Sequence, residues 1–316
     1  MRVAPVPLPV PLPVPVLLAR VPAPHVALHV DGRIAHVAAS PNRDVIAFAT
    51  RDRVWVSRDG GASFDPELEG KGEISELFVD AGGVVYAKRP DALGMQEEGM
   101  RTHWIPIPPL DGRLLDADGG LFLGEQWDEG VVMDAIDGLA WINLLEGAQW
   151  SVIAGKIVTE GEARVIVYRS APELHLIANH EEHDRIAWRG HGYPPCAALV
   201  GDDQAWIVDR AQPSQLLAID NQGKAARVPI DLDLDADRVT CTIAGNDHAT
   251  YATFSVDGGA PRLYGLSFVT RDATYLGGDP IDLRAVDDRG RALGLRDGNL
   301  VRRADDGSFE LLARGR

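Results

Sequence analysis

The sequence predicts an all-β protein, a seven-bladed β-propeller with a proline-rich N-terminal extension. Three observations lead to this fold class. Short apolar segments alternate with turns rich in Gly, Asp and Asn, and helical periodicity is weak. One unit, a polar turn followed by a compact apolar strand, recurs seven times along the chain. Its period of about 41 residues matches the blade length of propellers, roughly 40–45 residues with four strands each.

The seven units align on a single position of an inner strand. Because the sheet of a blade is covered on both faces by its neighbours, its strands should read as nearly continuous apolar runs, as these do. A pair of β-sandwiches is the alternative fold, but it would not require near-equal units. The aligned positions are Phe48, Tyr86, Leu123, Val167, Ile207, Ala252 and Leu293.

Each unit divides into four expected strands. In the first unit these strands lie within 34–40, 45–50, 53–59 and 63–68. In the last unit they lie within 282–288, 291–295, 299–304 and 308–314. Since the last unit owns all four strands, the ring should close without help from the N-terminus. The segment His25–Val30 is expected to add an edge strand to it.

The stretch Pro5–Val16 precedes the repeats and alternates proline with Val and Leu. Proline fixes φ and removes a backbone donor, so the segment should form a polyproline II rod and not a strand or helix. An apolar rod left uncovered is a liability, and we therefore expect it to dock on a partner or on a neighbouring copy. The predicted organisation is an extension over 1–24 and a propeller over 25–316.

A turn in the first unit carries the motif S-x-D-x-G-x-[ST]-[WF]. It resembles the Asp-box of the sialidase-type (BNR) propeller family, where the motif lies between the third and fourth strands of a blade, as expected here. The resemblance implies that the Asp side chain accepts hydrogen bonds from the turn amides and that the aromatic residue fills space between sheets. The motif is structural in that family. The matching residues are Ser57, Asp59, Gly61, Ser63 and Phe64.

The catalytic features of sialidases are only partly matched. Those enzymes hold a substrate carboxylate with three arginines, and Arg33, Arg238 and Arg284 could form such a triad. No convincing Tyr–Glu nucleophile pair accompanies them, and the chain has no phosphate-binding loop or nucleophile elbow. The resemblance therefore points to the non-catalytic branch, which includes sortilin-type receptors and photosystem assembly factors. A sialidase-like glycan hydrolase or lectin is the alternative.

The chain has 316 residues and a formal net charge of −16. This charge argues against nucleic-acid and anionic-membrane partners, because both need a basic surface. No apolar run is long enough to span a bilayer. The prolines interrupt any signal-peptide apolar region, so the sequence favours the cytoplasm, with a secreted or periplasmic location as the alternative. Cys196 and Cys241 are expected to be buried free thiols.

Propellers usually bind through the loops between blades and those between the second and third strands. In this chain those loops mix charges with aromatic residues and prolines, as protein-binding surfaces do. Their acidic patches favour a basic protein partner. The candidate binding residues are Trp127, Asp128, Glu129, Trp150, Tyr193 and Arg210.

One acidic loop places aspartates at alternate positions, which puts them on one side of an extended chain. The favoured interpretation is a solvated loop without a cofactor, and the alternative is a calcium site. The residues concerned are Asp231, Asp233, Asp235 and Asp237. Taken together, the sequence predicts a non-enzymatic protein-interaction module, a scaffold or an assembly subunit.

Overall fold

The computed structural model describes residues 27–69, 72–100, 103–106, 113–126, 130–135, 141–145, 150–159, 162–169, 173–180, 183–191, 194–201, 204–208, 214–232 and 238–316. Within these ranges the regular elements are strands, β1 to β29, with no helix among them. The all-β prediction is therefore confirmed for the described residues. In this part of the chain no helix is present that could cross a membrane.

From β2 onward, each run of four consecutive strands forms one antiparallel sheet. The first three sheets consist of β2 (His36–Ala39), β3 (Ile46–Ala49), β4 (Arg53–Ser57) and β5 (Asp65–Glu69); β6 (Glu76–Val79), β7 (Val85–Lys88), β8 (Ala92–Gln96) and β9 (His103–Pro106); and β10 (Leu114–Asp118), β11 (Leu121–Gln126), β12 (Gly130–Ala135) and β13 (Trp141–Leu145).

The next two sheets consist of β14 (Trp150–Thr159), β15 (Glu162–Arg169), β16 (Glu173–His180) and β17 (His183–His191), and of β18 (Ala197–Val200), β19 (Gln204–Val208), β20 (Gln215–Ile219) and β21 (Ala225–Pro229). The last two consist of β22 (Val239–Gly245), β23 (Thr250–Val256), β24 (Arg262–Ser267) and β25 (Asp272–Tyr275), and of β26 (Asp282–Val286), β27 (Ala292–Arg296), β28 (Asn299–Arg303) and β29 (Phe309–Arg314).

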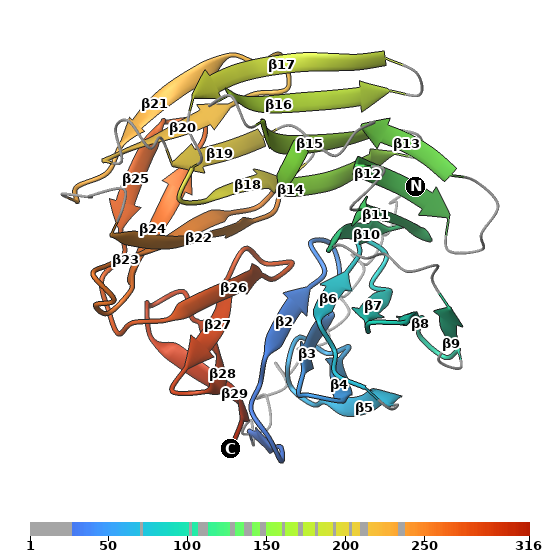
Figure 1. Ribbon diagram of the computed structural model, residues 1–316. Helices are drawn as coiled ribbons and strands as arrows, with labels where there is room; N and C mark the ends of the chain where they lie inside the picture. The colour runs from blue at the N-terminus through green and yellow to red at the C-terminus, as the bar shows by residue number, and fades with distance from the viewer. Residues whose placement is uncertain are drawn as a thin grey trace, which may run out of the picture.

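The sheets are arranged around a central axis as in a propeller (Figure 1). The first strand of each sheet lies innermost and contacts the first strand of the next sheet, and β26 contacts β2 to close the ring. The predicted propeller arrangement is thus confirmed. The seven sheets correspond one to one with the repeat units of the sequence.

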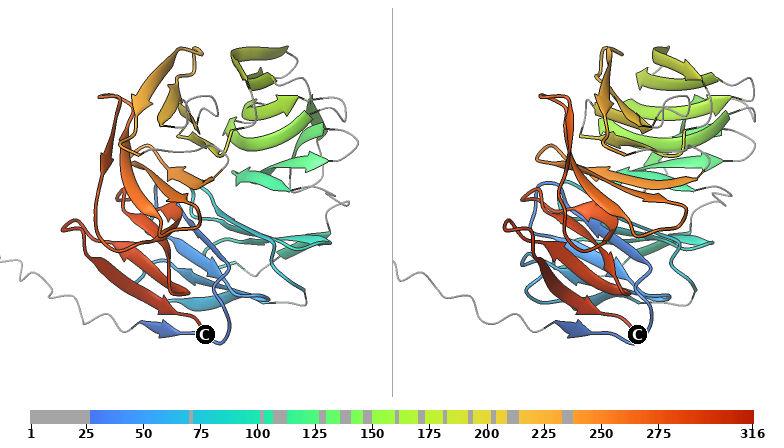
Figure 2. Two further views of the ribbon diagram at one scale, coloured as in Figure 1. Left: turned by 60° about the vertical axis from the view of Figure 1, so that its left-hand side comes forward. Right: turned by 90° about the vertical axis from the view of Figure 1, so that its left-hand side faces the viewer.

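The short strand β1 (Leu28–His29) adds to the outer edge of the last sheet (Figure 2). It runs parallel to β29, with Leu28 opposite Ala313 and His29 opposite Arg314. The expected edge strand from the N-terminal side is therefore present in the described part of His25–Val30. The last sheet still owns four consecutive strands of its own, as predicted.

The hydrophobic core lies between neighbouring sheets. Where the ring closes, Phe48 and Phe64 of the first sheet pack with their ring centroids 5.1 Å apart, in one cluster with Leu300 and Leu312 of the last sheet. Both faces of each sheet must bury apolar side chains in this arrangement. This requirement explains the apolar runs of the sequence.

The two cysteines form a disulfide, so the expectation of free thiols was wrong. Cys196 directly precedes β18, and Cys241 lies in β22, the first strand of the following sheet. Their Cα atoms are 5.8 Å apart and they are separated by 45 residues. That separation is close to one repeat unit, so the fold brings the two thiols to neighbouring innermost strands. The disulfide links two sheets.

Candidate interaction surfaces

The turn between β4 and β5 holds the Asp-box residues in a tight set of hydrogen bonds. The Asp59 carboxylate accepts hydrogen bonds from the Ser57 hydroxyl at 2.8 Å, the Ser63 backbone N–H at 2.9 Å and the Ser63 hydroxyl at 2.7 Å. The Gly61 N–H donates to the Ser57 hydroxyl oxygen at 2.7 Å. Gly61 has a φ of 90°, which favours glycine. The Asp-box side chains therefore stabilise the turn that contains them.

These hydrogen bonds also set the protonation of Asp59. Partial burial alone would raise the pKa of this carboxyl, but the hydrogen bonds from Ser63 and Ser57 outweigh it and lower the pKa below its ordinary value. The charged form is therefore the one that stabilises the turn.

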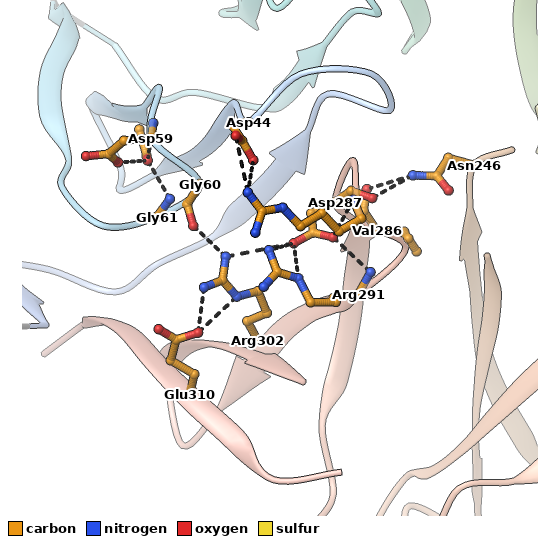
Figure 3. Close-up of polar contacts among 12 residues, drawn as sticks. Asp44, Asp59, Gly60, Gly61, Asn246, Val286, Asp287, Arg291, Arg302 and Glu310 are labelled. Carbon is orange, nitrogen blue, oxygen red and sulfur yellow. Dashed lines mark hydrogen bonds and ion pairs between the residues drawn. The ribbon is translucent and has the colours of Figure 1, made fainter. Parts of the chain in front are cut away.

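The same turn forms part of the seam where the ring closes (Figure 3). The Arg302 guanidinium, on β28 of the last sheet, donates a hydrogen bond to the carbonyl oxygen of Gly60 and pairs with Glu310. Asp287, almost fully buried, pairs with Arg291 at 2.8 Å and lies 3.8 Å from Arg302. We call this set of residues the closure cluster. Its ion pairs lie within the last sheet, and the hydrogen bond from Arg302 to Gly60 joins that sheet to the first.

Each sheet has two ends. One end, here called the turn face, carries the turns between its first and second and between its third and fourth strands. The opposite end, the loop face, carries the other connections. The sequence prediction placed partner binding on the loop face.

Buried polar side chains on the turn face join neighbouring sheets. Asp80 accepts hydrogen bonds from the Val84 N–H at 2.8 Å, the Tyr86 hydroxyl at 2.9 Å and the Gly119 N–H at 3.3 Å. The Gly120 N–H in turn donates to the Tyr86 hydroxyl oxygen at 3.1 Å. Burial, together with the nearby Asp80 charge, raises the pKa of Tyr86 well above its ordinary value. The phenol therefore stays a neutral donor.

The contact between sheets recurs elsewhere on the turn face. The Ser40 hydroxyl donates to the Asp80 carbonyl oxygen at 2.7 Å, and the Asn246 side-chain amide donates to the Asp287 carbonyl oxygen at 2.8 Å. The Tyr251 hydroxyl donates to the Gly290 carbonyl oxygen at 2.7 Å. In each case the partner lies about one repeat further along the chain. The polar groups on this face therefore hold the ring together.

A cavity of about 460 Å³ lies along the axis of the ring, lined by the innermost strands. Its charged lining includes Asp116, Lys156 and Arg284. The Asp116 carboxylate accepts a hydrogen bond from the Ile157 N–H at 2.8 Å. Burial raises the pKa of Asp116, and the nearby Lys156 charge opposes this shift.

A second cavity, about 580 Å³, opens on the turn face at the sixth sheet. We call it the β24–β25 groove. Apolar lining comes from Leu266, Phe268, Val269 and Leu276, together with the ring of Tyr251. Its polar lining includes Asp247, His248, Asp272 and Arg303. The groove combines apolar and aromatic walls with both signs of charge, as ligand sites do.

The turn between β24 and β25 presents the most exposed large apolar side chain in the described part of the chain. Val269 is 91% exposed at its tip. The Thr270 hydroxyl bridges Ser267 and Asp272, at 2.6 and 2.9 Å, and so holds the turn in shape. The neighbouring Phe268 packs edge-on against Trp206 of the fifth sheet, with ring centroids 5.9 Å apart. Val269 is therefore exposed on a turn whose shape is fixed by hydrogen bonds and by the packing of Phe268.

The side chains of the six predicted binding residues on the loop face lie outside the described residues. Trp150 begins β14, but its side chain is outside the described residues, as are the other five candidates. Those five are Trp127, Asp128, Glu129, Tyr193 and Arg210. Their role stays a prediction.

The acidic loop is described only at its start. Asp231 is exposed, and the other candidate calcium ligands, Asp233, Asp235 and Asp237, lie outside the described residues. Within the described residues no group of three or more His, Cys, Asp or Glu side chains could hold a metal ion. The calcium alternative stays a prediction.

The three arginines considered for a sialidase-like triad have different surroundings. Arg284 lines the axial cavity and pairs with Asp282 at 2.6 Å. Arg238 pairs with Asp257 at 3.5 Å, and neither it nor Arg33 lines that cavity.

The β24–β25 groove lies on the turn face, where the sequence predicted no binding residues. The signal available in the sequence was the pair Phe268–Val269, two apolar residues within a short polar turn. Together with Tyr251, Leu266 and Leu276 of the groove they form one apolar surface, and contiguous exposed apolar surface marks interaction sites.

No protein-family model matches the chain, and no curated protein matches it. Solved structures do resemble it. PorZ, described as an essential bacterial surface component of the type-IX secretion system of Porphyromonas gingivalis, superposes with a TM-score of 0.60 at 12% identity. The match covers 90% of this chain but only 39% of PorZ, so the chain spans well under half of that protein's length.

Two further structures match over most of both chains. YCF48 from Cyanidioschyzon merolae has a TM-score of 0.57 at 14% identity, covering 86% of this chain and 95% of YCF48. A chain of the Mitotic Checkpoint Complex has a TM-score of 0.56 at 11% identity, covering 92% of each chain. At such low identity these similarities establish the fold alone.

Proposed function

We propose that this chain is a non-enzymatic protein-interaction module, a scaffold or an assembly subunit, in which each of the seven sheets is one propeller blade. It binds a protein partner through the propeller surface and through the proline-rich segment Pro5–Val16. The strongly acidic chain suits a partner with a basic surface.

The observation that carries this proposal is the β24–β25 groove with Val269 at its rim. An exposed apolar side chain on a braced turn, beside an aromatic wall, gains free energy when a protein partner covers it. Because hydrogen bonds already hold the turn, binding there loses little conformational entropy. Tyr275, 52% exposed on β25, adds apolar surface to the same sheet.

Three buried ionisable groups of the described ring support the same conclusion. Asp80 caps a turn, and Asp287 and Arg302 belong to the closure cluster. Each of these charges is used to hold backbone or a neighbouring sheet in place. This is a structural use of charge, and it favours a scaffold over a hydrolase.

The similar structures give further support. PorZ is described as a component of a secretion system, and another neighbour is a chain of the Mitotic Checkpoint Complex. Proteins that work within assemblies therefore share this fold. The Asp-box geometry at Asp59 supports membership of the non-catalytic Asp-box propellers, which is also part of the proposal.

We further propose that the chain works in an oxidising compartment, the alternative to the cytoplasm that the sequence left open. The disulfide between Cys196 and Cys241 supports this location, since structural disulfides persist outside the reducing cytosol.

The direct test is purification of the tagged protein from its native host, alongside a variant lacking residues 1–24 and the variant Val269→Asp. The proposal expects a protein partner at near-equal amount with the full chain, reduced with either variant, while thermal melting stays nearly normal. A full chain that purifies without any partner would contradict it.

A sialidase-like hydrolase or lectin is the second candidate, favoured by the Asp-box turn and by Arg284 in the axial cavity. Incubation with a panel of sialosides separates the two functions. Turnover that Arg284→Ala abolishes would overturn the scaffold proposal, whereas no turnover with any sialoside would agree with it.

A further inference from the structure

We propose that, in the absence of a partner, Pro5–Val16 of the same molecule occupies the β24–β25 groove. The inference rests on the proposed function because it assigns the proline-rich docking segment a resting site. It identifies one occupant for an apolar groove that the described residues leave open.

The direction of β1 leads toward this groove. Leu28 pairs with Ala313 in parallel, so the N-terminal end of β1 points toward the start of β29, at Phe309. Phe309 pairs with Arg303, which lines the groove. The N-terminal end of β1 therefore points toward the turn face and not the loop face.

The reach of the segment is sufficient. Eleven residues lie between Val16 and Leu28, and an extended chain of that length spans up to about 40 Å. The whole of β29 has six residues, which corresponds to about 20 Å. The connection is therefore longer than β29, whose first residue, Phe309, pairs with the groove-lining Arg303.

The apolar lining of the groove suits a polyproline II helix. Such helices bind in grooves lined by aromatic side chains, because their proline rings stack on flat apolar surfaces. Tyr251 and Phe268 supply the aromatic surface here, and Val269 and Leu276 supply aliphatic contact. The alternating Val, Leu and Pro of the segment would cover all four.

The charges are complementary as well. Residues 1–26 contain Arg2 and Arg20 and no Asp or Glu. The groove presents two carboxylates, Asp247 and Asp272, at its polar edge. Arg303 is the opposing charge in the lining, and Asp305 and Asp306 follow it closely in the chain. The N-terminal arginines therefore meet a surface with excess negative charge.

Docking within one molecule is favoured over docking between copies. A tether of eleven residues gives a local concentration in the millimolar range, far above that of a second copy in dilute solution. A polyproline helix also loses little conformational freedom when it binds. One contact would cover both the apolar segment and the exposed Val269.

The test is limited proteolysis of the purified full chain with trypsin, followed by mass spectrometry of cleavage after Arg20. Val269→Asp changes an exposed side chain and should leave thermal melting unchanged. We expect it to speed cleavage after Arg20 at least about fivefold, because cleavage follows the population of the undocked state. Met100→Asp is the matched control: Met100 is 59% exposed between β8 and β9, and its change should leave the rate unaltered.

Equal rates in the three proteins would overturn the inference. So would protection that disappears when the wild-type protein is diluted about tenfold, because that result indicates docking between copies. As an independent readout, a photoreactive phenylalanine at position 269 of the full chain should crosslink to residues 5–16 of the same molecule. Crosslinks that exclude this segment would also overturn it.

The trypsin experiment on the purified chain, compared with purification from the native host, separates the two proposals. If cleavage is unaffected by Val269→Asp but the native partner still purifies with the full chain, the inference is wrong and the proposed function stands. If the groove variant releases the segment but no partner is found, the inference stands without the proposed function.

Discussion

The Arg302 guanidinium donates a hydrogen bond to the backbone carbonyl oxygen of Gly60, a residue 242 positions earlier in the chain. This contact joins the last sheet to the Asp-box turn of the first. In repeat folds each unit is stabilised by its interfaces with its neighbours. The closure cluster therefore contributes to the stability of the ring at the interface between its first and last sheets.

Replacing Arg302 with Met should lower stability by about 3 kcal/mol, because Glu310 and the Gly60 carbonyl lose a partner whose side chain is only 8% exposed. Thermal and denaturant melting measure this loss. Arg303→Met serves as the control, since Arg303 belongs to the same strand but not to the closure cluster. Equal destabilisation by the two changes would show that the closure cluster has no special role.

Asp59→Ala should cost about 1 kcal/mol, because three hydrogen bonds to the carboxylate disappear from an exposed turn. An unchanged melting temperature would show that the Asp-box does not stabilise this turn.

The contribution of Asp59 should depend on pH. Its pKa in the folded protein lies below the ordinary 3.8, so its stabilisation is present above that pH and is lost as the pH falls through the lowered value. Melting curves of the wild type and Asp59→Asn should therefore differ at neutral pH and converge in strong acid. A difference that grows on acidification would contradict this assignment.

Gly61→Ala should destabilise by about 1–2 kcal/mol. The φ of 90° strains any residue with a Cβ, and the added carbon would lie 3.2 Å from Leu312 of the last sheet. Gly298→Ala is a useful comparison, because its φ is also positive at 76° but a Cβ there meets open space. Because Gly61 lies against Leu312 of the last sheet, Gly61→Ala should lower the melting temperature more than Gly298→Ala does.

Removing the disulfide with Cys196→Ser and Cys241→Ser together should lower stability by about 2–4 kcal/mol, since the bond closes a loop of 45 residues. Melting with and without reductant gives the same comparison for the wild type. Mass spectrometry of the alkylated protein from its native host should find no free thiol. Two alkylated cysteines there would contradict the proposed oxidising compartment.

Much of the fold could be predicted because inner-strand residues such as Phe48 and Leu293 recur at a nearly constant spacing along the chain. The hydrogen bonds of Asp59 were also predictable, since they are local to one turn. The disulfide was not predicted because two cysteines alone do not indicate a disulfide. Their separation of 45 residues, about one repeat, is what places Cys196 and Cys241 on neighbouring sheets.

The β24–β25 groove could not be predicted in the same way. Its shape depends on the edge-on contact of Phe268 with Trp206 of one neighbouring sheet and on the position of Arg303 of the other. Such contacts join residues of three sheets. The local sequence marks Phe268 and Val269 as apolar residues in a polar turn, but the groove beside them depends on this packing.

The measurement that tests the central proposal most directly is photocrosslinking in the native host, with the photoreactive residue at position 269 and, as the control, at position 100. The account predicts a covalent adduct with one partner protein at position 269 and none at position 100. Deleting residues 1–24 should weaken that adduct, because the proline-rich segment also engages the partner. Adducts of equal yield at both positions, or no protein adduct at either, would contradict the claim that this propeller is a protein-interaction module.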